Sequence, residues 1–356
     1  MTARFAALGL AVLALGVGIA TGLLRLGLAV PVAPLASQHA VLMVAGFLGT
    51  VIALERAVAF GGWLAYAAPL ASGLAALALV TGFDALARAL WLGAGLVLAG
   101  VSVALARRQP LPHMALLAVG AAAWLAGNTL HAVQRDDLAL AWWFSFLVLT
   151  IAAERLEMTR LMRRRAGASA AFAGCVALLL AGAGASLLDP PKGGAVFGLA
   201  LVALAAWLCI FDIARRTLRA GGFAGYAATA LLAGYAWHAI GGVAWLVWAQ
   251  GVGPMRDTAL HALGLGFVMS MVFGHAPLVV PAIARRRMRF SSAFYAPLVL
   301  LHLSVAWRLA ASVFAPELRW PAGLAHVLAL ALFVTVLARS LRAGARAPLG
   351  HAHPAH

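Results

Sequence analysis

Residues 5–24 read FAALGLAVLALGVGIATGLL, twenty residues without a charged side chain. About 20 apolar residues in an α-helix cross the hydrocarbon core of a bilayer. Lipid offers no hydrogen-bond partners, so a spanning segment must satisfy its own backbone groups, as a helix does. This stretch therefore predicts a transmembrane helix, and other apolar runs of about the same length predict further spans.

Eleven further apolar runs of similar length follow the first one. They lie at residues 38–60, 63–82, 87–106, 112–134, 138–154, 167–188, 193–213, 223–250, 256–282, 291–314 and 320–342. Only 10% of the residues are charged, whereas a soluble domain has about 25%. We expect an all-α polytopic membrane protein, with a single transmembrane domain over 1–345 and a histidine-containing cytoplasmic tail over 346–356.

The 26 basic residues predict the orientation of the twelve spans. Nineteen of them fall on the side that carries the N-terminus and six on the opposite side, while Arg308 lies inside the eleventh span. Basic loops stay in the cytoplasm, so both termini are expected there. The net charge of +16 would suggest nucleic acid in a soluble protein, but these charges lie in short runs between spans. The expected partner is therefore the lipid bilayer, and no nucleic acid is expected.

Short similar strings recur every four spans. Residues 51–56 read VIALER at the end of the second span, and residues 150–155 read TIAAER at the end of the sixth. The tenth span begins with His261-Ala262, much as the second begins with His39-Ala40. Repeats at a fixed spacing indicate repeated structural units. The pattern suggests three units of four helices.

Three histidines are predicted to lie at one depth near the outer side. A rise of 1.5 Å per residue puts His39 and His261 roughly 12–15 Å outward of the midplane, and His131 at a similar level. Ionisable side chains inside a span are costly, so they mark candidate functional sites. Imidazoles facing each other in an apolar shell suit the axial ligation of haem iron. The alternative is that each histidine only hydrogen-bonds a neighbouring group.

A second set of histidines is predicted deeper in the membrane. His238, His275 and His302 come from spans 9, 10 and 11, which are near in sequence. Three converging imidazoles would bind copper or another metal. A proton path or a polar packing cluster is the other interpretation of these residues.

Two glutamates end the second and the sixth span on the inner side, each followed directly by an arginine. Glu55 and Glu154 are either interfacial partners of those arginines or the mouth of a proton pathway from the cytoplasm.

Two segments carry a resemblance to known membrane proteins. They are residues 39–49, HAVLMVAGFLG, and residues 261–275, HALGLGFVMSMVFGH. With the twelve-span layout they resemble the catalytic subunit of haem-copper oxidases and, more closely, the NnrS family, which is linked to nitric oxide metabolism in denitrifying bacteria. The resemblance implies three four-helix arcs, a bacterial inner membrane, and a low-spin haem between His39 and His261.

The chain also departs from the oxidases. They take copper ligands from helices 6 and 7, whereas this chain has no histidine between His131 and His238. A conventional oxygen-reducing centre is therefore not expected. The NnrS family is described as binding haem and copper, so the resemblance leaves a copper site elsewhere open.

The first functional hypothesis is a haem-binding inner-membrane protein of NnrS-like type, acting in nitric oxide metabolism or tolerance or in electron transfer with a redox partner. If it is an enzyme, it is an oxidoreductase acting on nitric oxide or a related small molecule. A multi-pass transporter, with midplane histidines lining a substrate or proton path, is the alternative. A haem or metal insertion factor is the third hypothesis.

Overall fold

The structure is a computed structural model that describes residues 2–30, 33–160, 166–284 and 286–345. The described part contains twelve helices that are long and apolar enough to cross a membrane, which confirms the predicted fold class. These spans are Ala3–Arg25, Leu35–Phe60, Trp63–Val80, Asp84–Arg108, Pro112–Ala132, Asp136–Met158, Ala168–Ala185, Pro190–Phe211, Gly222–Ala249, Pro254–Pro281, Ser292–Phe314 and Pro316–Gly344. The protein is a multi-pass membrane protein that associates with a lipid bilayer. The predicted tail, 346–356, lies outside the described residues.

Eight of the spans contain one long α-helix and little else. They are α1 (Thr2–Arg25), α5 (Asp84–Arg108), α6 (Pro112–Ala132), α7 (Asp136–Met158), α8 (Ala168–Ala185), α9 (Pro190–Phe211), α11 (Gly222–Ala249) and α15 (Arg319–Ala345), which the short 3₁₀ turn η6 (Pro316–Leu318) precedes. The third span joins η3 (Trp63–Tyr66) to α4 (Ala67–Val80), and the eleventh joins η5 (Ser292–Phe294) to α14 (Tyr295–Phe314). The short helix α10 (Ala214–Thr217) lies between spans 8 and 9.

The second and tenth spans are interrupted. The second consists of η1 (Ala33–Gln38), α2 (His39–Val41), η2 (Leu42–Leu48) and α3 (Gly49–Phe60). The tenth consists of α12 (Pro254–His261), η4 (Ala262–Met269) and α13 (Ser270–Ala284). Both η2 and η4 are π-helices, which are rare and which often occur at functional sites.

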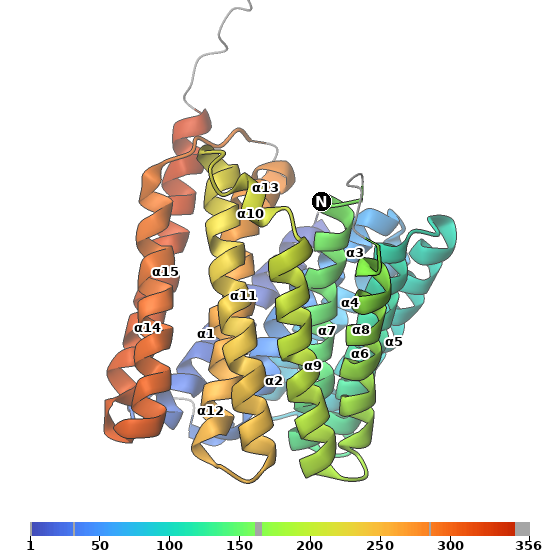
Figure 1. The fold of residues 1–356 in the computed structure, drawn as a ribbon. Helices are drawn as coiled ribbons and strands as arrows, with labels where there is room; N and C mark the ends of the chain where they lie inside the picture. Colours follow the sequence, from blue (N-terminus) through green and yellow to red (C-terminus); the bar gives the residue numbers. More distant parts are fainter. Residues whose placement is uncertain (1, 31–32, 161–165, 285, 346–356) are drawn as a thin grey trace, which may run out of the picture.

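The helices stand side by side and alternate in direction (Figure 1). Spans that follow each other in the sequence pack against each other, and α15 also contacts α1, so the neighbours form a closed circuit. The first described residues and the end of α15 lie at the same end of the bundle, and α12 begins at the other end (Figure 1). The arrangement in three four-helix arcs stays a prediction.

The sixth span is the most enclosed part of the bundle. Of its most apolar window, 78% is buried, against 28% for the first span, so α7 lies inside the protein while α1 faces lipid along much of its length. On the side facing α6, the Trp143 indole donates to Asn128 at 2.9 Å, and the Asn128 amide donates to the Trp91 carbonyl at 2.9 Å. A buried amide that is satisfied on both sides fixes how three spans fit together.

Candidate functional site

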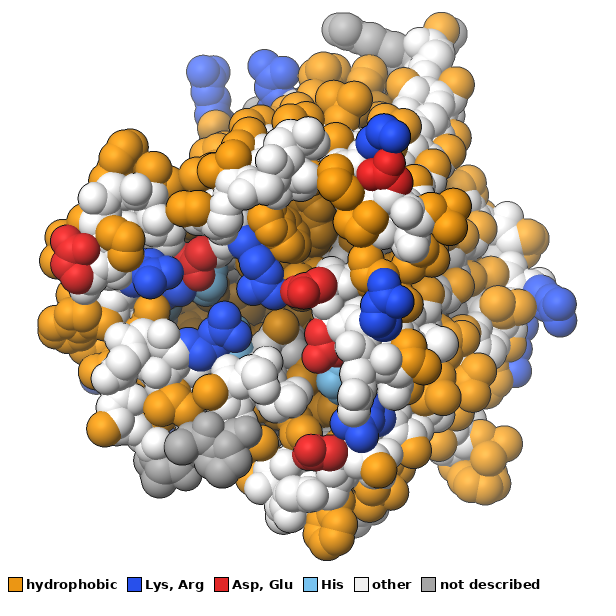
Figure 2. Space-filling view, turned by 90° about the horizontal axis from the view of Figure 1, so that it is seen from below, with side chains coloured by type: hydrophobic (Ala, Val, Ile, Leu, Met, Phe, Trp, Pro, Cys, Tyr) orange, Lys and Arg blue, Asp and Glu red, His pale blue; other side chains and the backbone are white. Residues whose placement is uncertain are grey.

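A cavity of about 370 Å³ lies at the end of the bundle where α12 begins, which is the lower end in Figure 1. Side chains from spans 1, 2, 6, 10, 11 and 12 line it. Figure 2 looks onto this end and shows histidine surface inside a hollow that arginine and acidic side chains surround. Pockets of roughly 300–1,000 Å³ hold drug-sized ligands. The cavity is therefore large enough for an organic cofactor.

His39, the first residue of α2, lines the cavity. Its Nδ1 lies 2.7 Å from the backbone carbonyl oxygen of Gly18 in α1. A carbonyl oxygen only accepts, so Nδ1 carries the proton and donates it, which leaves Nε2 with a free lone pair. Gly22 packs closely against the same ring, because a Cβ atom there would sit 2.9 Å from His39 Cε1. Helix α1 thus holds the His39 imidazole by a hydrogen bond and by close packing.

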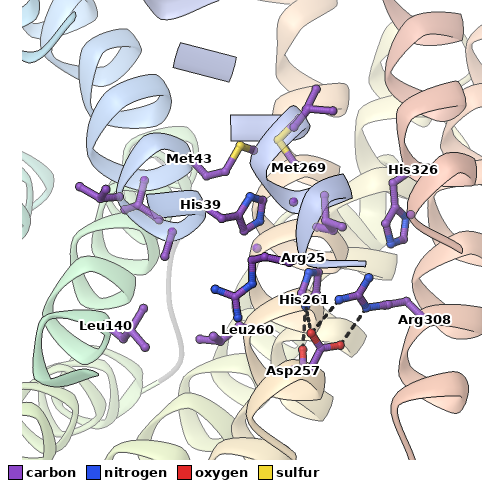
Figure 3. A pocket seen from close by; sticks show the side chains of 18 of the residues that line it. Arg25, His39, Met43, Leu140, Asp257, Leu260, His261, Met269, Arg308 and His326 are labelled. Carbon is purple, nitrogen blue, oxygen red and sulfur yellow. Dashed lines mark hydrogen bonds and ion pairs between the residues drawn. The ribbon is translucent and has the colours of Figure 1, made fainter. Parts of the chain in front are cut away.

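His261, the last residue of α12, lines the same cavity (Figure 3). Its Nδ1 lies 2.9 Å from the backbone carbonyl oxygen of Asp257, one helical turn earlier. By the same reasoning Nδ1 is the donor and Nε2 keeps its lone pair. Within the described part of the chain, no hydrogen-bond partner contacts Nε2 of His39 or of His261. Metal-binding histidines characteristically donate their other ring N–H to a carbonyl or carboxylate.

A third imidazole, His326 of α15, also lines the cavity. Its Nδ1 is 2.7 Å from the hydroxyl of Ser304, and that hydroxyl donates to the Leu301 carbonyl at 2.8 Å. Because the single hydroxyl proton goes to Leu301, the hydroxyl accepts from His326 Nδ1, and His326 Nε2 is unprotonated. That nitrogen is buried and has no partner among the described residues. His39, His261 and His326 thus each keep an unprotonated ring nitrogen, and that of His326 is buried.

The two π-helices begin one to three residues after the candidate ligands. In the second span η2 starts at Leu42, and in the tenth η4 starts directly after His261. A π-helix leaves some backbone carbonyls misaligned with the usual partners, and at η2 a neighbouring span bonds one of them: Ser72 donates to the Ala45 carbonyl at 2.8 Å. At η4 the contact runs the other way, because Ser270, which directly follows η4, donates to the Ala230 carbonyl of α11 at 2.8 Å. Matched irregularities beside both histidines support a functional role for this end of the two spans.

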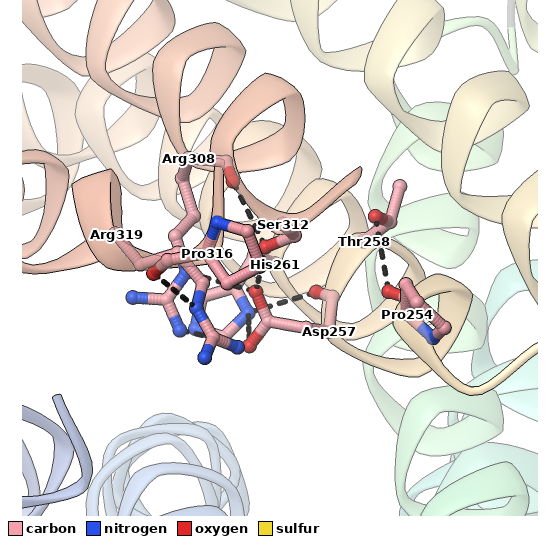
Figure 4. Close-up of polar contacts among 8 residues, drawn as sticks. All are labelled: Pro254, Asp257, Thr258, His261, Arg308, Ser312, Pro316 and Arg319. Atoms are coloured by element: carbon pink, nitrogen blue, oxygen red, sulfur yellow. Dashed lines mark hydrogen bonds and ion pairs between the residues drawn. The ribbon is translucent and has the colours of Figure 1, made fainter. Parts of the chain in front are cut away.

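An ion pair lies beside His261 at the mouth of the cavity (Figure 4). Arg308 donates from Nε and Nη2 to the two carboxylate oxygens of Asp257, both at 2.8 Å, and Ser312 donates to Asp257 Oδ2 at 2.6 Å. Arg308 was predicted from the sequence to lie inside the eleventh span, but its partner Asp257 was not predicted. A signal existed, because a buried arginine in a span requires an acidic group at the same depth, and Asp257 is one turn from His261.

The cavity lining carries more positive than negative charge. Four arginines and two aspartates line it, which gives a formal charge of +2. They are Arg25, Arg256, Arg308, Arg319, Asp136 and Asp257. Carboxylate or other anionic groups on a ligand would therefore be stabilised at its mouth.

His131, the third predicted cofactor ligand, does not line the cavity. Its Nδ1 lies 2.6 Å from an Asp136 carboxylate oxygen, and its ring lies 5.5 Å from that of Trp91 and 5.7 Å from that of Trp143. The predicted depth brought His131 to the same end as the cavity, but its side chain points between two indoles of α5 and α7.

The structure does not bring His238, His275 and His302 together. His238 is fully buried and stacks on Phe267, with ring centroids 4.4 Å apart. His302 Nδ1 accepts from the Trp237 indole at 2.9 Å. Among the described residues no group of three histidine, cysteine or acidic side chains is arranged to hold a metal ion.

His275 instead joins the two predicted glutamates at the opposite end of the bundle. Its Nε2 lies 2.5 Å from Arg155 Nη2 and 3.8 Å from Glu154 Oε2. Glu55 pairs with Arg56 and is close enough to act on Glu154 electrostatically. The ends of spans 2, 6 and 10 thus meet in one charged cluster, apart from the cavity.

The chain belongs to a family described as a domain of unknown function, DUF8744, whose profile matches residues 4–342. No curated protein and no solved structure matches the chain. The family match extends from the first span into the twelfth and names no activity, so function is argued from the cavity.

Proposed function

We propose that this chain is a haem-binding inner-membrane protein of NnrS-like type, acting in nitric oxide metabolism or tolerance or in electron transfer. His39 and His261 would hold the haem iron. One observation carries the proposal: two imidazoles from different spans line one cavity, each with Nδ1–H on a backbone carbonyl and an unprotonated Nε2. The same two positions are the ones that the resemblance to oxidases and to the NnrS family implies.

The residues of the cavity fit this cofactor. Haem, when bound, supplies a redox-active iron. The chain supplies nitrogen lone pairs from His39 and His261, and it offers the guanidinium groups of Arg25 and Arg319 near them for anionic substituents. Apolar side chains such as Leu140 and Phe144 line the same space and give it partly apolar walls. Copper was the second predicted cofactor, but the described residues offer no three-ligand His, Cys or acidic cluster for it. The proposal is therefore confined to haem.

The proposal also includes the setting of the protein. The charge distribution supports both termini in the cytoplasm, and the resemblance to the NnrS family implies a bacterial inner membrane, so the cavity would open on the outer side. A redox partner would then deliver or remove electrons there. If the protein turns over, it is an oxidoreductase acting on nitric oxide or a related small molecule. Glu55 and Glu154 would form the cytoplasmic mouth of a proton path.

An optical spectrum tests the proposal. The full chain is purified in detergent from haem-supplied cells and measured before and after dithionite. We expect a sharp low-spin haem band that is lost in His39→Ala and in His261→Ala. His302→Gln is the matched control, because it also removes a membrane histidine but outside the cavity, and it should keep the band. A colourless wild-type protein under full haem supply would falsify the proposal.

One observation favours the alternative, a transporter. The cavity has a formal charge of +2, as expected for an anion site. The predicted midplane histidines do not line it, however, so the site would consist of its arginines. A colourless protein that binds a small carboxylate, and loses that binding in Arg25→Gln, would support the transporter instead.

A further inference from the structure

The two candidate ligands differ in what surrounds the ring nitrogen that faces away from the cavity. Asp257 lies four residues before His261 in α12, so both side chains lie on one face of the helix. Two Asp257 oxygens face His261 Nδ1, the backbone carbonyl at 2.9 Å and carboxylate Oδ1 at 3.3 Å. The N–H of His261 is thereby directed toward a residue that bears a negative charge.

The carboxylate of Asp257 cannot easily turn away. Arg308 donates hydrogen bonds to both of its oxygens, and Ser312 donates to one of them. Arg308 and Ser312 are four residues apart in α14, so they act from one helix face. The side chains of Asp257 and Arg308 are 23% and 8% exposed. Removal of one partner of such a buried pair leaves an unpaired charge. Two side chains of span 11 therefore fix the position of the Asp257 carboxylate of span 10.

His39 has no comparable support. Its Nδ1 donates to the neutral Gly18 carbonyl, and within the described residues no carboxylate pairs with that nitrogen. A carboxylate near the N–H of a metal-bound imidazole makes the ring a stronger electron donor and fixes its orientation, and a lone carbonyl does so less. The two imidazoles are therefore inequivalent.

We propose that Asp257, held by Arg308 and Ser312, is a positioning residue that orients His261 and makes it the stronger of the two iron ligands. This inference rests on the proposed haem site. A stronger donor stabilises the oxidised iron, so Asp257 lowers the reduction potential. Arg308 and Ser312 act through Asp257 and do not touch the cofactor in this assignment.

The experiment compares the reduction potential and haem release of the holoprotein with those of Asp257→Asn. Asp84→Asn is the matched control, because it is the same change at an exposed position where α5 begins. For Asp257→Asn we expect about a tenfold shift of the redox equilibrium toward the reduced form, about 59 mV for one electron. We also expect haem transfer to a scavenging globin to be about 10–100-fold more favourable.

Two further variants keep the test decisive. Asp257→Asn combined with Arg308→Gln removes both charges, so it folds without an unpaired guanidinium and separates the effect on His261 from that of net charge. The reduction potential of this double variant should still be higher than that of the wild type. Ser312→Ala keeps the ion pair and should give a smaller shift in the same direction. If the wild type binds haem but the double variant has the same reduction potential as the wild type, this inference alone is overturned. A wild type without haem overturns the proposed function and this inference together.

Discussion

A histidine binds iron only through a nitrogen whose lone pair is free, and at the residue scale this rule separates the candidates. His39, His261 and His326 donate from Nδ1 and keep an Nε2 without a hydrogen-bond partner among the described residues, although that of His326 is buried. His302 uses its Nδ1 lone pair to accept from Trp237, so its remaining nitrogen is a donor. His275 already faces an arginine through Nε2. Depth in the membrane cannot reveal these differences, because they depend on partners in other helices.

Gly22 offers a test of His39 that leaves the ligand in place. A Cβ atom at Gly22 would lie 2.9 Å from His39 Cε1 and 3.0 Å from Nδ1, so Gly22→Ala pushes the ring from its position. Overpacking of this kind typically costs about 1–3 kcal/mol, which corresponds to about a 5–150-fold loss of haem affinity. The measurement is the haem content per protein after purification.

Gly16→Ala is the control for this change. Gly16 lies on the same helix, and a Cβ atom there would meet nothing within 4 Å. We expect wild-type haem content from it. If Gly22→Ala also retained full haem content, His39 would not be held against α1 as a ligand.

At the element scale, the spans were predictable and their interruptions were not. The predicted runs 38–60 and 256–282 agree with the spans Leu35–Phe60 and Pro254–Pro281 to within a few residues, because apolar length sets where a helix enters lipid. The π-helices η2 and η4 lie inside these runs, where apolar residues continue without any break in composition. A backbone carbonyl of η2 accepts a hydrogen bond from Ser72 of the next span, and a single sequence does not show such a partner.

Helices α9 and α11 approach each other most closely at Gly198. A Cβ atom at Gly198 would lie 2.6 Å from the Leu246 nitrogen and 2.7 Å from the Gly242 carbonyl oxygen, both of them backbone atoms that cannot rotate away. Small residues let membrane helices approach each other this closely. Gly198→Leu should therefore separate the two helices and lower stability by about 3 kcal/mol or more.

Thermal unfolding in detergent measures this effect, with Gly174→Leu as the control. Gly174 is an exposed position on α8 where nothing lies within 4 Å of an added Cβ. The control should unfold at the wild-type temperature. Equal unfolding temperatures for the two variants would contradict the assigned packing of α9 on α11.

At the scale of the whole molecule, alternation explains both ends of the bundle. Spans 2, 6 and 10 run in the same direction, so the residues that end them share one end of the protein. Glu55, Glu154 and His275 meet there, while His39 and His261 begin spans 2 and 10 at the other end. His39 and His261, which were predicted at one depth, both line the cavity. Depth alone could not predict that His131 faces two indoles, because it does not give the direction of a side chain around its helix.

The predicted orientation determines from which side the cavity is reached, and single cysteines test it. Cys175 and Cys209 are first replaced by serine, and one new cysteine is introduced per variant. Leu188→Cys lies in the connection between spans 7 and 8, at a residue that is 91% exposed. Arg219→Cys lies at an exposed residue between spans 8 and 9, at the opposite end. The side with 19 of the basic residues carries Arg219, whereas the side with 6 carries Leu188, so the end with Arg219 is expected in the cytoplasm.

A membrane-impermeant maleimide should therefore label Leu188→Cys in intact spheroplasts, and Arg219→Cys only after lysis. The reverse pattern would move the cavity mouth to the cytoplasm, where a partner on the outer side could not reach it.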